Sequence, residues 1–94
     1  MLCHLGILLN DVLNIILKNI EIIAKSNTTD SVKTIAIQLI NTKDCIVNDV
    51  HTIINTVSTE NNDNISLLLK DSECTIYNIN LNTYSGHTNY GVKT

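Results

Sequence analysis

The chain has 94 residues, enough for one small domain, and a formal net charge of −3 at pH 7. It contains no Arg, Phe or Trp and only three Tyr, so it lacks the side chains that clamp phosphates and stack on nucleobases. We therefore expect no nucleic-acid partner.

The first predicted element is an amphipathic helix over residues 2–25. Glu21 and Lys25 stand four residues apart, which is a favourable pairing on a helix surface. Asp11 and Lys18 interrupt the apolar stretch, so we expect no transmembrane span. The apolar side chains recur at steps of three and four, the helical period, at Leu5, Leu9, Val12, Ile16, Ile20 and Ile23.

The same period continues in a second helical segment. Asp30 and the two Thr before it provide the chemistry of a helix start. Apolar residues then recur from Val32 to Val57. The polar run 41–44 leaves two alternatives, one long helix with a polar notch or two helices hinged near Thr42.

The last third of the chain is predicted to be less helical. Residues 58–64 contain no apolar side chain and predict a loop. Residues 65–69 are either a short helix or the first strand of a hairpin. The second strand would be 74–82, where Tyr77, Ile79 and Leu81 alternate with Asn.

These elements together predict a mainly α fold, a small helical hairpin or bundle with a C-terminal β-hairpin or extended tail. A single small domain would cover residues 1–84, followed by a flexible tail over residues 85–94. An all-α four-helix protomer is the alternative. We identify no internal repeat, and we interpret the 14 Asn as a compositional bias rather than as selected chemistry.

No grouping of reactive side chains predicts an enzyme. The three Cys and three His lack the paired short spacings of zinc sites. Cys74, His87 and Asp71 are a conceivable nucleophilic group, but Cys74 opens an apolar alternating stretch, where an inert buried thiol is the ordinary interpretation. We therefore expect no catalytic residue, no cofactor and no metal site.

The broad apolar face of the first segment predicts a non-enzymatic interaction protein. Its six periodic residues, from Leu5 to Ile23, would form the interface with a second copy of the chain or with another helical protein. Under this hypothesis the protein is a homo-oligomer or a partner-binding helical module.

The spacing of Cys3, Cys45 and Cys74 resembles the three-cysteine arrangement of secretoglobins, with Cys45 in mid-chain and Cys74 after the apolar run 67–69. This resemblance implies a four-helix protomer, disulfides between two chains and a small hydrophobic ligand held between them. The alternative function is therefore a secreted carrier that works as a disulfide-linked dimer. The chain departs from the family at His4, where secretoglobins usually have Pro.

Overall fold

The computed structural model describes residues 2–26, 32–56, 62–84 and 86–94. These residues form seven β-strands and no helix, so the prediction of a mainly α fold is wrong, and so is its four-helix alternative. No described segment forms a helix able to cross a membrane. The strands are β1 (Leu2–Asn10), β2 (Ile16–Ser26), β3 (Val32–Ile40), β4 (Cys45–Thr56), β5 (Asp63–Lys70), β6 (Cys74–Tyr84) and β7 (Thr88–Lys93).

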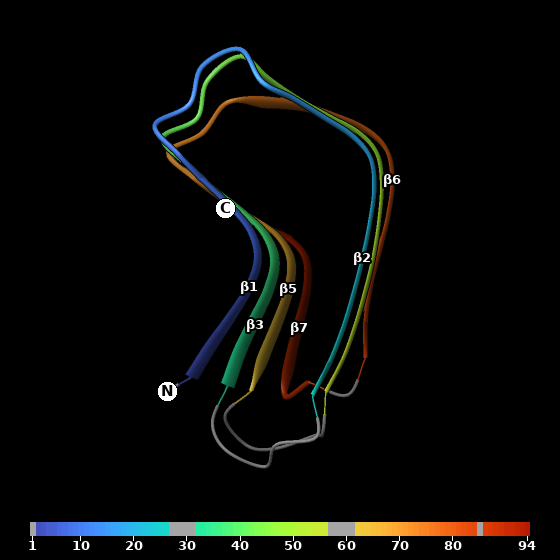
Figure 1. Ribbon diagram of the computed structural model, residues 1–94. Helices are drawn as coiled ribbons and strands as arrows, with labels where there is room; N and C mark the ends of the chain where they lie inside the picture. The colour runs from blue at the N-terminus through green and yellow to red at the C-terminus, as the bar shows by residue number, and fades with distance from the viewer. Residues whose placement is uncertain (1, 27–31, 57–61, 85) are drawn as a thin grey trace.

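The strands build two parallel sheets. One sheet has the order β1-β3-β5-β7 and the other has the order β2-β4-β6. The chain visits the two sheets alternately, so consecutive strands make one rung of a β-solenoid, and the rungs lie over one another in Figure 1. We call residues 2–26 the first rung, 32–56 the second rung and 62–84 the third rung. β7 adds one more strand to the four-stranded sheet.

The pairing register reveals an internal repeat that inspection of the sequence missed. Leu2 lies beside Val32, and Lys33 lies beside Asp63, so the same sequence offset separates the partners in both pairs of rungs. In the other sheet, Cys45 pairs with Cys74, and the sequence offset between these two partners is one residue shorter than in the pairs above. The repeat is therefore one rung of the solenoid, and the third rung lacks one of the positions that the second rung has.

Asn and Asp side chains mark the positions where each rung turns. All eight described non-Gly residues with positive φ are Asn or Asp. Asn and Asp tolerate the left-handed conformation better than other residues with a Cβ, so these positions select them. Part of the Asn content is thus a requirement of the fold. The equivalent positions in successive rungs are Asp11, Asn41 and Asp71; Asn14 and Asp44; and Asn19, Asp49 and Asn78.

The same residues explain why the sequence resembled a helix. Inward-facing side chains in a strand recur at steps of two, but a left-handed residue shifts the alternation by one. In the second rung Val47 and Val50 are both buried, and Asp49 with φ 55° lies between them. Leu17 and Ile20 flank Asn19 in the same way in the first rung. Steps of two mixed with steps of three imitate the helical period.

Of the two C-terminal segments, 74–82 is a strand as predicted and 65–69 is a strand and not the alternative short helix, but the predicted hairpin pairing is wrong. β5 and β6 cover the two segments predicted as a hairpin, yet β5 pairs with β3 and β7, whereas β6 pairs with β4. Within the segment expected to be a tail, residues 88–93 form β7. The predicted loop 58–64 lies mostly outside the described residues, and its last two residues begin β5. The predicted start of the second helix, before Val32, also lies outside them.

The core lies in the rungs that are covered on both sides. In the second rung Leu39, Val47 and Ile54 are fully buried, as is Ile65 in β5, which lies between β3 and β7. The inward-facing residues of the first rung, including Leu9, pack against this core but are only partly buried. Burial therefore depends on having a neighbouring rung, because the stack itself supplies the cover.

We predict that Asp49→Val destabilises the fold by about 1–2 kcal/mol, because a β-branched residue is strained at positive φ. Asp49→Gly should change the stability by less than about 0.5 kcal/mol, since Gly adopts this conformation freely. Urea unfolding followed by circular dichroism measures both effects. Asn55→Val, at an exposed site in the same strand without positive φ, is the matched control and should be neutral. Equal effects of Val at the two positions would contradict the assignment.

Candidate functional site

The structure separates the residues that could have formed a nucleophilic group. Cys74 is the first residue of the 11-residue strand β6, and His87 follows the far end of that strand, so the length of β6 separates them. At roughly 3.3 Å per residue this is about 30 Å along the strand. The backbone N–H of His87 donates to the carbonyl of Asn62 at 3.0 Å, which fixes it at that end. Cys74 and His87 therefore lie at opposite ends of β6. Asp71 precedes Cys74 in the chain and lies at the end of β6 away from His87.

The described residues do not gather into a metal site. No three His, Cys, Asp or Glu among them come close enough together to hold an ion. A shallow hollow of about 420 Å³ lies over the bend of β2 and β4, lined by Glu21, Asp49 and His51 among others. It is open to solvent, and the residues that line it provide no buried donor or acceptor that would fix a ligand.

The largest group of buried polar side chains lies where β4 ends and β5 begins. Asn64 is fully buried, and its Nδ2 donates to Thr56 Oγ1 at 3.0 Å, to the Tyr84 carbonyl at 3.0 Å and to Asn89 Oδ1 at 3.3 Å. The Thr56 hydroxyl donates in return to Asn64 Oδ1 at 3.2 Å. Asn62 Oδ1 accepts from the His87 backbone at 2.7 Å. These contacts are all internal, so the group joins β7 to the third rung rather than presenting a site.

We predict that Asn64→Asp destabilises the protein by about 2–4 kcal/mol, because a carboxylate oxygen would face the carbonyl of Tyr84 and the amide oxygen of Asn89 where the donor now lies. Thermal unfolding at pH 7 measures the loss. Asn55→Asp makes the same chemical change at an exposed position of β4 and should leave the melting temperature within about 2 °C. A similar small effect for both variants would show that the amide of Asn64 does not organise this end of the stack.

The three cysteines occupy two different environments. Cys3 is exposed on β1, at the edge of the four-stranded sheet. Cys45 is buried and Cys74 is partly buried, and these two lie beside one another in register. All three are free thiols in this structure. The geometry thus divides the cysteines into a neighbouring pair and a separate exposed thiol.

The six predicted interface residues lie in the first rung, but they do not form one stripe. Leu9 and Ile20 face inward and pack against the core. Ile16 is 62% exposed and Ile23 is 55% exposed, both on the outer face of β2. Leu5 is 43% exposed on β1, and Val12 lies between the two strands. The structure therefore places these residues on two strands and two faces.

All six residues belong to the first rung, and no other rung in the described part of the chain packs against the outer side of this rung. Among the described residues, β1 and β2 each have a paired neighbour on one edge only. Their free edges expose backbone N–H and C=O groups, which are a template for adding another strand. Aliphatic residues that are buried in the second rung have partly exposed equivalents here, among them Ile7, Leu9 and Leu17. The first rung therefore leaves a partly exposed apolar surface at the end of the stack. The strand edges beside this surface are unpaired.

The outer face of β2 adds charges of both signs to this edge. Glu21, Ile23 and Lys25 are all exposed and alternate along the strand. In a strand, residues four apart are about 13 Å apart, so Glu21 and Lys25 do not pair with each other as they would on a helix. Among the described side chains the ion pair present is Lys43 with Glu73 at 3.9 Å, elsewhere in the fold. Glu21 and Lys25 are therefore available to an incoming strand.

Comparison with protein-family models, curated proteins and solved structures finds no match for this chain. The resemblance to secretoglobins therefore has no support beyond the cysteine spacing, and the all-β solenoid contradicts the helical fold that it implied.

Proposed function

We propose that this protein is a non-enzymatic β-solenoid that assembles into a symmetrical dimer by pairing the free edges of β2 from two copies. The uncovered first rung is the observation that carries the proposal. The contact differs from the helical interface expected from the sequence, because it consists of backbone hydrogen bonds along a strand edge and not of a helix face.

Apolar cover is one reason for an assembly. The second rung shows what the first rung lacks: Val47, Val50 and Ile54 are buried because rungs lie on both sides. Covering the equivalent residues of the first rung would remove more aliphatic surface from water, at about 25 cal/mol per Å². The molecule measures 38 × 23 × 16 Å, so the end of the stack is large enough for the roughly 800 Å² per partner of a standard interface.

The charges on β2 favour a second copy in antiparallel orientation. If two β2 strands pair with Ile23 opposite its own symmetry mate, Glu21 of each chain lies opposite Lys25 of the other. Directly opposed side chains of an antiparallel pair have Cβ atoms about 4.5–5.5 Å apart, close enough for an ion pair. Two such pairs form around one twofold axis. If the twofold axis moves by one residue along β2 in either direction, both Glu21–Lys25 pairs are lost.

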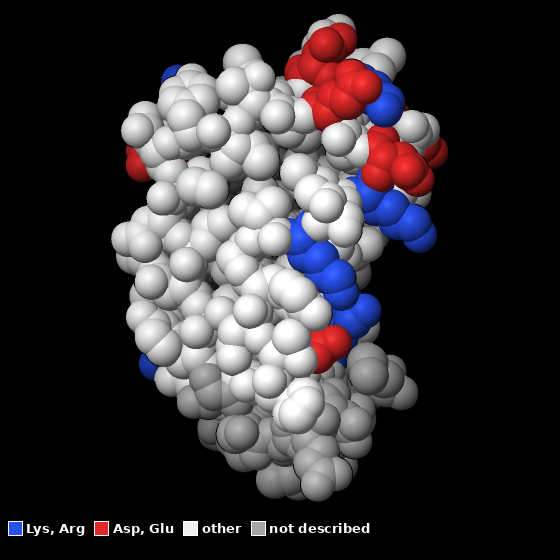
Figure 2. Space-filling view, turned by 180° about the vertical axis from the view of Figure 1, so that it is seen from behind, with Lys and Arg blue, Asp and Glu red and all other residues white. Residues whose placement is uncertain are grey.

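An alternative assembly would stack the first rung of one copy on the third rung of another. β6, the free edge of the third rung in its sheet, carries no charged residue between Cys74 and Tyr84. Figure 2 shows that in the view from behind, charged side chains gather along one border while most of the surface is uncharged. Such a contact would leave Glu21 and Lys25 unmatched, and its head-to-tail repetition would extend without closing. The antiparallel dimer satisfies the charges and closes.

The absence of catalysis is also part of this proposal. The reactive side chains considered from the sequence, Cys74 and His87, lie far apart. The hydrogen bonds of the buried polar group around Asn64 are made to protein atoms. These observations support a structural or assembling role.

We predict that Glu21→Lys and Lys25→Glu each weaken dimerisation by about 10- to 100-fold, because each variant replaces two attractive pairs with two repulsive ones, a change of about 1–3 kcal/mol. The double variant Glu21→Lys/Lys25→Glu restores the opposite charges and should dimerise as the wild type does. Light-scattering mass after size exclusion, over a dilution series, measures the dimer against the chain mass of 10.4 kDa.

Lys18→Glu provides the matched control, because it makes the same charge change on β2 but lies outside the overlap of residues 20–26. It should leave the dissociation constant within about twofold. A wild-type monomer at all concentrations would overturn the proposal. Assemblies that grow beyond a dimer and ignore the charge reversals would support stacking of the first rung on the third.

A further inference from the structure

Two cysteines that are one rung apart in sequence lie side by side in the stack. Cys45 and Cys74 are register partners at the first residues of β4 and β6. Cys45 is 2% exposed, and Cys74 packs against the same core cluster. The equivalent residue of the first rung is the aliphatic Ile15.

We propose that Cys45 and Cys74 are a redox site that closes to a disulfide and links the second rung to the third. Neighbouring strands of a sheet are about 4.7–4.9 Å apart, and disulfides join Cα atoms that are about 4.4–6.8 Å apart. Register pairing therefore places the Cα atoms of the two residues within the range that a disulfide spans.

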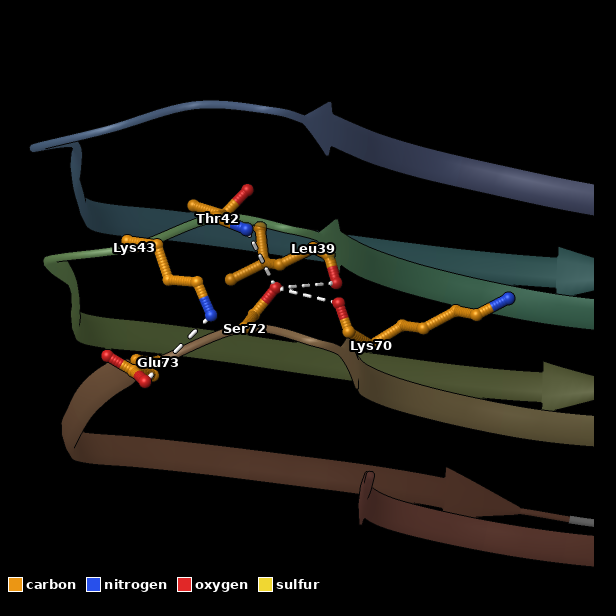
Figure 3. A network of polar contacts seen from close by, with 6 residues as sticks. All are labelled: Leu39, Thr42, Lys43, Lys70, Ser72 and Glu73. Atoms are coloured by element: carbon orange, nitrogen blue, oxygen red, sulfur yellow. Dashed lines mark hydrogen bonds and ion pairs between the residues drawn. The ribbon is translucent and has the colours of Figure 1, made fainter.

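The turn before Cys74 holds this register (Figure 3). Ser72 Oγ accepts from the Thr42 backbone at 3.0 Å and lies 3.2 Å from the Leu39 carbonyl and 3.0 Å from the Lys70 carbonyl. The backbone N–H of Glu73 donates to the Thr42 carbonyl at 2.9 Å, and that of Cys45 donates to the Glu73 carbonyl at 3.4 Å. These bonds attach the third rung to the second immediately before the cysteines.

The two thiols differ in how easily they react. Cys74 is partly exposed, and both sulfur-bearing residues line a surface hollow of about 410 Å³ with Asp44, Glu73 and Thr75. Burial, followed by the interaction with Cys74, raises the pKa of Cys45 to about 12. Because the thiolate is the attacking species, Cys74 reacts first with a disulfide from solution and Cys45 resolves the intermediate.

The oxidant is a small-molecule disulfide, and the exchange balances in two steps. The Cys74 thiolate attacks one sulfur of the reagent, forms a mixed disulfide and releases one reagent thiolate, which takes up the proton that Cys74 lost. The Cys45 sulfur loses its proton to water, attacks the Cys74 sulfur and releases the second reagent thiolate, which takes up a proton from water. Two protein thiols are oxidised by two electrons, and one reagent disulfide is reduced to two thiols.

The link would constrain the unfolded chain as well as the stack. It closes a loop that contains β4 and β5 and ends at the first residue of β6, and closing loops of this size raises stability. Cys3 takes no part, since it is exposed on β1. The odd number of cysteines is then one internal pair and one free thiol.

The test uses the full chain with Cys3→Ser, so that two thiols remain. The reagents are cystamine, which is cationic, and oxidised glutathione, which is anionic. Either should reduce the thiol count from two to zero with a mass loss of about 2 Da and no added reagent. Cystamine should react severalfold faster, because Asp44 and Glu73 line the hollow. Oxidation should raise the melting temperature by about 5–15 °C, reversed by reductant.

Two further variants separate the pair from two independent thiols. With Cys3→Ser/Cys45→Ser, Cys74 should keep one cystamine adduct, because nothing displaces it. With Cys3→Ser/Cys74→Ser, Cys45 should react at least about tenfold more slowly than Cys74 does in its own variant. Circular dichroism first confirms that each variant keeps its sheets. Two stable adducts on the parent, a disulfide between chains, or reaction only in denaturant would each overturn the proposal.

Discussion

The whole molecule depends on keeping the stacked strands in register from one rung to the next. Strands in register must turn at the same place in every rung, or the hydrogen-bonded ladders of the two sheets would lose alignment. Asn and Asp in the left-handed conformation provide that turn at equivalent positions, as at Asn19, Asp49 and Asn78. The Nδ2 of Asn41 also donates to Asp11 Oδ1 at 2.7 Å, so the turning residues bond from rung to rung.

Stacking also determines which surfaces are left for function. A rung is buried only by its neighbours, so the middle of this short stack holds the core and its ends remain open. The free edge of β2 has both a hydrogen-bonding backbone and a self-complementary arrangement of Glu21, Ile23 and Lys25. An assembly through this edge extends the interaction that builds the fold, since it adds a strand where the chain itself has none.

The cysteine pair follows from the same geometry. A solenoid repeats one position at every rung, so two Cys a repeat apart become neighbours although a whole rung of chain separates them. The proposed disulfide would strengthen the contact between the second and third rungs, whereas the proposed dimer would cover the first rung. The two proposals concern opposite sides of the second rung and make independent use of one architecture.

The sequence by itself determined the aliphatic character of the core and the strand segment around Tyr77, because composition and the alternation of apolar residues with Asn are local signals. It also held the repeat, in Asn or Asp at positions such as 11, 41 and 71. Only the tertiary structure decided that the first two segments are strands. A left-handed residue within a strand changes the apolar step from two to three, as at Asp49, and this imitates a helix. Which strands pair, which edge stays free and which cysteines meet depend on contacts between residues a full rung apart, and no local pattern specifies them.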